Sequence, residues 1–185
     1  MLASLPPFPR PRGTLLDDAP LHAHGIRLRR AEHADLPALA HIHGRWRQKD
    51  LLLAPWSAAQ KQAFVDDQFR LQHSHYVQHR ARADFCVIVP AEGSGLLGKL
   101  YLDRSSREWR IVDLLLDSEA RGRGLGSALI GWIQQAARDA RATGVSLQVG
   151  INNPQAQALY RRQGFEPLPG DDGMNVTFLW TAAPR

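Results

Sequence analysis

Apolar residues after residue 124 recur at intervals of three and four positions, which places them on one face of an amphipathic α-helix. The positions that follow this period are Leu125, Leu129, Ile130, Ile133, Ala136, Ala137 and Ala140. Before them, residues 109–116 form a mostly apolar run of strand length. The pattern therefore predicts a strand, a short connection over residues 117–124, and a long helix that ends before Gly144.

The rest of the chain alternates between the same two patterns. Short apolar runs predict strands at residues 26–30, 85–89, 96–103, 145–149, 165–168 and 176–181. Residues 31–46 have helical spacing, and Ser57 is expected to cap a helix that runs to about residue 79. Asn153 followed by Pro154 is typical of the start of another helix. This order indicates an α/β (α+β) domain with a mixed central sheet.

The length of 185 residues suits one folded domain and leaves little room for a second. Prolines at positions 6, 7, 9 and 11 interrupt the beginning of the chain, so no signal-peptide core is expected there. We interpret residues 1–24 as a Pro-rich N-terminal arm, disordered or lying along a neighbour, and residues 25–185 as the single domain. No apolar run reaches membrane-spanning length, and Cys86 is the only cysteine. These features predict a cytoplasmic protein without a membrane partner.

Residues 121–126, Arg-Gly-Arg-Gly-Leu-Gly, have the composition of a phosphate-binding loop. The three glycines allow the backbone to turn sharply and to approach a ligand closely. The first turn of the following helix offers N–H groups without helical partners and the positive end of the helix dipole. Arg121 and Arg123 add positive charge. We expect this loop to bind an anion, in particular a diphosphate.

The spacing of the glycines disfavours two common nucleotide sites. A P-loop requires Gly-Lys-Ser/Thr after its variable residues, and the loop contains no lysine. A dinucleotide fingerprint requires its third glycine where Ser127 stands. A nucleotide-binding protein is therefore the weakest of the alternatives that stay open.

Two segments instead resemble the GNAT superfamily of N-acetyltransferases. The loop from Arg121 to Gly126 is similar to the acyl-CoA pyrophosphate loop of that family, Arg/Gln-x-x-Gly-x-Gly/Ala. The segment from Asn153 to Phe165 is similar to a second signature, Asn-x-x-Ala-x-x-Leu-Tyr-x-x-x-Gly-Phe, at every defining position. The resemblance covers about residues 26–181. It implies a GNAT-like acyl-CoA N-acyltransferase fold, with a central mixed sheet of six to seven strands and about four flanking helices.

The resemblance implies acetyl-CoA as co-substrate, bound where the fourth and fifth strands splay apart. In the family, the strand before the loop binds the pantetheine arm through its backbone, and an amide near Leu116 contacts the thioester oxygen. Asn153 matches a cofactor contact, although capping its helix would be a sufficient role. The cofactor-binding residues expected from the resemblance are Leu114, Leu115, Leu116, Arg121, Gly122, Arg123, Gly124, Leu125, Gly126, Ser127, Asn153, Ala156 and Tyr160.

Two residues are candidates for acid–base catalysis. Tyr160 matches the usual general acid of the family, and a half-buried tyrosine of the core is the alternative interpretation. Asp113 is the only acid inside the strand before the loop, and alternation places it on the face of Trp109, Ile111 and Leu115. It is a candidate general base, or a structural partner of an arginine. A water chain and Glu108 compete for the role of base.

The acceptor site is expected between the two early helices and the strand pair at the end of the chain. Gln68, Gln72, His75 and Tyr76 share a stripe of the helix at residues 57–79, which would suit a polar substrate or simply face solvent. The eight histidines contain one pair at helical spacing, His75 and His79, without the further ligands that a zinc site needs. No metal is therefore expected.

The formal net charge is +5, but no basic patch interleaved with aromatic residues indicates a nucleic-acid partner. The sequence predicts an N-acetyltransferase that moves an acetyl group from acetyl-CoA to a primary amine of a small molecule or peptide, by direct transfer in a ternary complex. A non-catalytic acyl-CoA-binding regulatory or assembly module is the main alternative. A homodimer is an open option, because dimers are common in the family that the sequence resembles.

Overall fold

Seven strands form one mixed sheet in the order β1-β2-β3-β4-β5-β7-β6 in the computed structural model, which describes residues 5–170 and 173–182. The strands are β1 (Ile26–Arg30), β2 (Asp84–Pro90), β3 (Gly98–Asp103), β4 (Glu108–Leu116), β5 (Gly144–Gly150), β6 (Glu166–Pro167) and β7 (Asn175–Thr181). The helices are α1 (Ala19–His22), α2 (Leu36–Arg47), α3 (Ala58–His79), α4 (Leu125–Asp139) and α5 (Pro154–Arg162). Short 3-10 turns are η2 (His33–Asp35), η3 (Gln48–Leu51) and η4 (Ser118–Ala120). The predicted mixed α/β architecture is confirmed.

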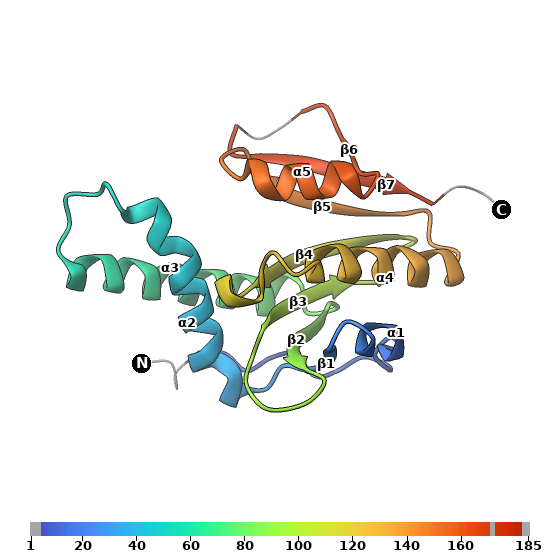
Figure 1. The fold of residues 1–185 in the computed structure, drawn as a ribbon, viewed down its shortest axis with the longest axis horizontal. Coiled ribbons are helices and arrows are strands. Elements are labelled where there is room, and N and C mark those ends of the chain that lie inside the picture. The colour runs from blue at the N-terminus through green and yellow to red at the C-terminus, as the bar shows by residue number, and fades with distance from the viewer. Residues whose placement is uncertain (1–4, 171–172, 183–185) are drawn as a thin grey trace.

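The parallel pairing of β4 with β5 is short, and this opens the sheet. Pairing joins Glu108–Ile111 to Gly144–Leu147 and goes no further along the two strands. Beyond that point β4 stays paired with β3, whereas β5 stays paired with β7. Figure 1 shows the resulting separation between the β1–β4 part and the part that holds β5, α5 and β7. The expected splaying of the fourth and fifth strands is therefore confirmed.

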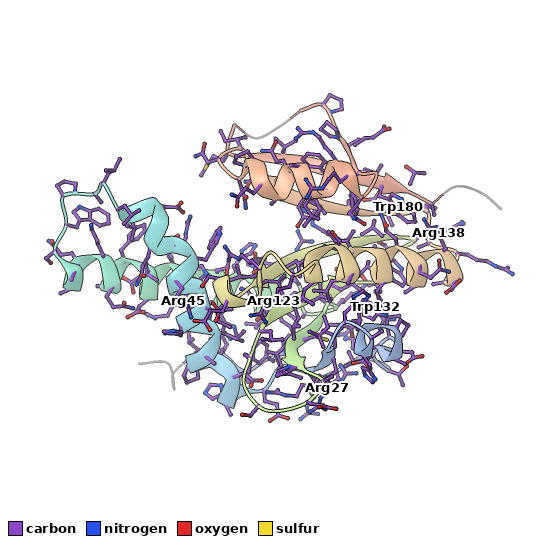
Figure 2. The ribbon with its side chains drawn as sticks, in the orientation of Figure 1. Arg27, Arg45, Arg123, Trp132, Arg138 and Trp180 are labelled. Atoms are coloured by element: carbon purple, nitrogen blue, oxygen red, sulfur yellow. The ribbon has the colours of Figure 1, made fainter. Side chains whose placement is uncertain are left out.

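Two apolar clusters cover the two faces of the sheet. The larger cluster packs α4, α5 and Leu21 of α1 against residues such as Leu100, Ile111 and Leu147. The smaller cluster packs α2 and α3 against Phe85 and Tyr101. In Figure 2, Arg138 of α4 lies beside Trp180 of β7, with its guanidinium carbon 4.8 Å from the indole centroid. This stacking contributes to holding α4 against the second part of the sheet.

The N-terminal segment packs onto the domain from residue 5 onward. Leu5 is buried. The centroid of the Phe8 ring lies 5.6 Å from that of Phe85 and 5.0 Å from that of His73. Further along, the indole N–H of Trp132 donates to the carbonyl of Asp17 at 2.8 Å (Figure 2 labels Trp132). Of the two alternatives for the N-terminal arm, disordered or lying along a neighbour, the structure contradicts disorder for residues 5–24, because their apolar side chains pack into both clusters. The first four residues lie outside the described part.

A β-bulge in β4 changes which side chains share a face. Tyr101 of β3 pairs with Asp113, whereas the next residue, Leu102, pairs with Ile111, so Val112 is an extra residue. One inserted residue reverses the alternation of side chains beyond it. Asp113 therefore lies on the α3 side with Tyr101. The prediction that it shares the face of Trp109 and Ile111 is wrong, because alternation assumes a regular strand.

Candidate functional site

The N-terminus of α4 lacks a side-chain cap and points its amides toward the end of β4. The N-cap residue is Gly124, in the left-handed conformation at φ +78°, and no acidic residue occupies the first turn. Gly122 also has a positive φ of +76°. The first N–H groups of a helix have no partner within it, so those of Leu125, Gly126 and Ser127 stay available to a ligand. The local geometry is that of an anion site.

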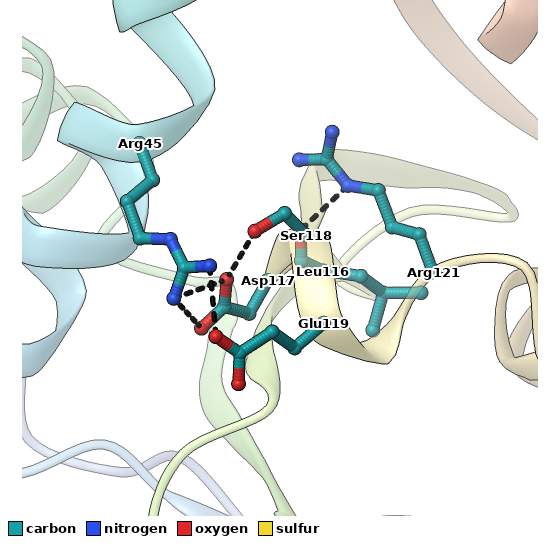
Figure 3. A network of polar contacts seen from close by, with 6 residues as sticks. All are labelled: Arg45, Leu116, Asp117, Ser118, Glu119 and Arg121. Atoms are coloured by element: carbon teal, nitrogen blue, oxygen red, sulfur yellow. Dashed lines mark hydrogen bonds and ion pairs between the residues drawn. The ribbon is translucent and has the colours of Figure 1, made fainter.

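An ion-pair network holds the connection between β4 and α4 in place (Figure 3). Arg45 of α2 lies 3.4 Å from the Asp117 carboxylate and 2.9 Å from the Glu119 carboxylate. The Nε of Arg121 donates to the carbonyl of Leu116 at 2.9 Å. Arg45 thus offsets two negative charges that would otherwise repel an anion beside the loop. In Figure 3 the terminal nitrogens of Arg121 point away from this network.

The second half of α5 lies next to the start of α4. Asn153 Oδ1 accepts a hydrogen bond from the amide of Ala156 at 3.1 Å, so its predicted capping role is confirmed. A Cβ atom on Gly126 would lie 3.1 Å from the Leu159 Cδ2 of α5, which leaves little room for a larger residue. The two predicted motifs are therefore brought together at the opening of the sheet.

Tyr160 lies in the apolar cluster on the α4 side, with its ring 5.7 Å from that of Phe165. Burial, together with the charge of Asp113, raises the pKa of Tyr160 to about 12. The phenol therefore keeps its proton at neutral pH, and its ring is part of the core.

A buried ion pair lies at the bulge of β4. The Nζ of Lys99 is 2.6 Å from Asp113 Oδ2, and the two side chains are 2% and 17% exposed. This oxygen makes no hydrogen bond of regular geometry within the described residues, so the contact is an ion pair. The expected partner of Asp113 was an arginine, and the structure provides Lys99 instead. A lysine inside the apolar pattern of residues 96–103 was the sequence signal that could have found it.

The predicted polar stripe of α3 divides between two environments. Gln72 Oε1 accepts from Lys99 Nζ at 3.2 Å, and the Lys99 ammonium lies 5.9 Å from the centroid of the Tyr76 ring. Gln68 is half-buried. His75 is exposed and stacks on His79 at 4.4 Å. Gln72 and Tyr76 thus join the Lys99 pair, whereas His75 does not.

His43 is a buried imidazole on α2 that the sequence analysis did not single out. It is 2% exposed, and both ring nitrogens lack hydrogen-bond partners within the described residues. Its ring lies 5.7 Å from each of the rings of Trp46 and Phe69. Burial, with the charges of Lys99 and Arg47, lowers the pKa of His43 to about 4.

The buried His43 is expected to make the protein less stable in mild acid. The unfolded chain binds a proton below a pKa of about 6.5, whereas the folded protein does so only near 4. The free energy of unfolding should therefore fall as the pH drops through this window, by about 2 kcal/mol between about pH 7.5 and about pH 4.5. Urea unfolding of wild type and His43→Leu at both pH values measures it. The loss should be smaller by that amount in His43→Leu, and equal losses would contradict the assignment.

No group of three or more His, Cys, Asp or Glu side chains is arranged to hold a metal ion in residues 5–170 and 173–182. Among the helices of the same residues, none combines the length and apolar character needed to cross a membrane.

Comparison with known proteins gives a consistent assignment for this architecture. The sequence model of the Acetyltransferase (GNAT) family matches residues 45–165. Human N-acetyltransferase 8 is 30% identical over 115 residues, which are 60% of this chain and 50% of that protein. The chain thus spans about half the length of this curated relative.

Solved structures share the fold at low sequence identity. The PaiA N-acetyltransferase of Thermoplasma acidophilum, in complex with coenzyme A, superposes with a TM-score of 0.63 at 15% identity, covering 85% of this chain and 99% of that one. Mutant forms of the spermidine/spermine N-acetyltransferase SpeG of Vibrio cholerae give a TM-score of 0.55 at 18% identity, over 85% and 94% of the two chains.

Proposed function

Because this chain belongs to the Acetyltransferase (GNAT) family, we propose that it transfers an acetyl group from acetyl-CoA to a primary amine of a small molecule or peptide. The observation that carries the proposal is the uncapped N-terminus of α4 at Gly124, beside the separation of β4 from β5. A diphosphate bound at these amides would leave the pantetheine arm free to follow the unpaired edge of β4. The fold of a neighbour solved with coenzyme A supports this placement.

In this proposal the loop and β4 hold the cofactor, with the roles that the sequence motifs imply. The amides from Gly122 to Ser127 and the guanidinium groups of Arg121 and Arg123 bind the diphosphate. The backbone of Leu114–Leu116 binds the pantetheine arm. Ala156 and Asn153 flank the cofactor at the start of α5, where Asn153 also caps the helix.

The proposed chemistry is direct transfer in a ternary complex. The nitrogen of the neutral amine attacks the thioester carbon, the new C–N bond forms, and the C–S bond breaks. Tyr160 donates its proton to the leaving thiolate, and the proton of the attacking amine passes to Asp113 or to water. At its raised pKa, Tyr160 is protonated at neutral pH and has a proton to give when the sulfur departs.

The acetyltransferase proposal is tested by measuring CoA release with a broad panel of primary amines. Polyamines, amino acids, aminoglycosides and peptides with free N-termini should be included, with acetyl-CoA binding measured in parallel by calorimetry. Amine-dependent CoA release supports the enzyme. Binding without release across the panel would favour the acyl-CoA-binding module, and absence of binding would overturn both.

Tyr160→Phe should preserve acetyl-CoA binding and lower the turnover number by about tenfold to a thousandfold, as expected for the loss of one acid–base group. The ring contacts of Tyr160 with Phe165 and Phe178 remain in the variant, so folding should be retained. Steady-state kinetics with the best amine of the panel measures the effect. Unchanged turnover would remove Tyr160 from the mechanism.

We also propose a domain range and a cellular location, both of which the sequence suggests. These are a single catalytic domain over residues 25–185 and a cytoplasmic location, consistent with one buried cysteine. Sedimentation of the purified protein would decide between monomer and homodimer.

A further inference from the structure

We propose that Lys99 is the positioning residue of the acceptor site, and that it holds Asp113 so that the second carboxylate oxygen faces the incoming amine. The inference rests on the proposed acetyl transfer and names a residue that the sequence motifs do not include. It assigns a role to the buried ammonium of Lys99, which has no part in the proposed cofactor site.

The two side chains of the pair differ in exposure. Lys99 is 2% exposed, whereas Asp113 is 17% exposed, so the lysine lies behind the carboxylate. Oδ2 is occupied by the ammonium at 2.6 Å and is itself buried. The exposed part of the Asp113 side chain is thus free to meet a ligand, and the ammonium fixes the rotamer from which it does so.

The position of Asp113 places this carboxylate at the opening of the sheet. It lies just beyond Ile111, where the pairing of β4 with β5 ends. Burial raises the pKa of Tyr76 on α3, Tyr101 on β3 and Tyr160 on α5, and the negative charge of Asp113 adds to each of these increases. Through its pairing with Tyr101, Asp113 lies on the side of the sheet that packs against α3, the helix expected to bind the acceptor.

Lys99 also links the pair to α3 through the hydrogen bond to Gln72 at 3.2 Å. The groups that face the pair are Gln72 and Tyr76 from α3, Tyr101 from β3, and the uncharged His43 from α2, whose pKa is lowered in part by Lys99. None of these carries a negative charge that could replace Asp113. An amine that enters beside these groups meets the Asp113 carboxylate, whose orientation Lys99 sets.

The proposed step is balanced without a further reactant. The amine nitrogen donates a hydrogen bond to the free oxygen of Asp113, attacks the thioester carbon, and releases its proton toward that oxygen as the C–N bond forms. The C–S bond breaks in the same transfer, and the sulfur leaves with the proton of Tyr160. Lys99 takes no part in the proton transfer and forms no bond to the substrate. It acts through Asp113 and is not a catalytic residue.

Three variants separate positioning from stability. Lys99→Arg keeps a positive charge beside Asp113, the double variant Lys99→Met/Asp113→Leu removes both charges together, and Lys61→Met is the matched control at the surface of α3. For each, acetyl-CoA binding is measured by calorimetry, and kcat and KM are measured with the best amine found for the wild type. All four proteins should bind acetyl-CoA alike, because the cofactor is proposed to be held by backbone amides of α4 and the backbone of β4, which side-chain substitutions at these positions leave in place.

The proposal predicts a split between the two substrates. The double variant should lose about a hundredfold or more in kcat/KM for the amine, an effect of the size of a lost positioned acid–base group, while KM for acetyl-CoA stays within about twofold. Lys99→Arg should recover most of the activity, and Lys61→Met should behave as wild type. A double variant that binds acetyl-CoA and acetylates the amine normally would overturn the inference. A wild type that binds acetyl-CoA but releases no CoA with any amine would instead overturn the proposed function.

A spectroscopic measurement checks the pair without turnover. The chain contains three lysines, Lys49, Lys61 and Lys99, so the side-chain signals of a lysine-labelled sample can be assigned by substitution. The Lys99 signal should shift on Asp113→Asn and on addition of the active amine, and the Lys61 signal should not. A Lys99 signal that responds to neither change would contradict the pairing.

Discussion

Replacing Gly124 with aspartate is expected to lower the affinity for acetyl-CoA by about two orders of magnitude, because the new carboxylate would lie at the amides that are proposed to bind the diphosphate. Two like charges about 5 Å apart near a protein surface repel by about 3 kcal/mol, and each 1.4 kcal/mol is a factor of ten in affinity. Calorimetry with acetyl-CoA measures the change. The space around Gly124 can take a side chain, since a Cβ atom there would meet no atom within 4 Å.

The matched control is Gly124→Asn, which has the same shape without the charge. Asparagine and aspartate both tolerate the left-handed conformation that Gly124 adopts at φ +78°, so the backbone cost should be similar in the two variants. The difference in affinity between them isolates electrostatics. Equal affinities for acetyl-CoA would mean that the diphosphate does not bind at the start of α4.

Replacing Asp113 with leucine is expected to destabilise the protein by about 3 to 5 kcal/mol, because the Lys99 ammonium would stay buried without its counter-ion. Lys99 is 2% exposed. Besides Asp113, its ammonium contacts the Gln72 side chain and the ring faces of Tyr76 and Tyr101, and none of these can neutralise its charge. Urea unfolding followed by circular dichroism measures the free energy of unfolding.

The double variant Lys99→Met/Asp113→Leu should recover most of that stability, because removal of both partners leaves no buried charge unpaired. It is also the variant that tests the acceptor site, so the stability measurement shows that a loss of activity there does not come from unfolding. A single Asp113→Leu variant as stable as wild type would contradict the burial of the Lys99 charge.

The ion pairs of Arg45 give the proposed enzyme a link between its two substrate sites. Arg45 comes from the last turn of α2, and its partners Asp117 and Glu119 precede the phosphate loop. Arg45 thereby ties α2, which packs beside the acceptor stripe of α3, to the loop that would hold the cofactor (Figure 3). These ion pairs join residues more than seventy positions apart, so no local sequence pattern predicts them.

The sequence by itself determined the features that depend on a few consecutive residues. The glycines at 122 and 124 adopt positive φ, Asn153 caps α5, and Gly164 ends it at φ +79°, as the local patterns predict. Ser57 forms a capping box with Gln60 at the start of α3. Such features can be read from sequence because backbone sterics and nearby hydrogen bonds fix them before any long-range packing. The family resemblance rests on these segments.

Only the tertiary structure decided what the side chains between those segments contact. One unpaired residue, Val112, turned Asp113 to the opposite face of the sheet and placed it against Lys99 of the neighbouring strand. The Phe8 ring packs against Phe85, which lies far along the chain. A strand pattern reports alternation within one segment, whereas register, bulges and burial depend on the strand beside it. For this reason the sequence predicted the loop proposed to bind the cofactor, and the structure was needed to reveal the buried pair proposed to position the acceptor.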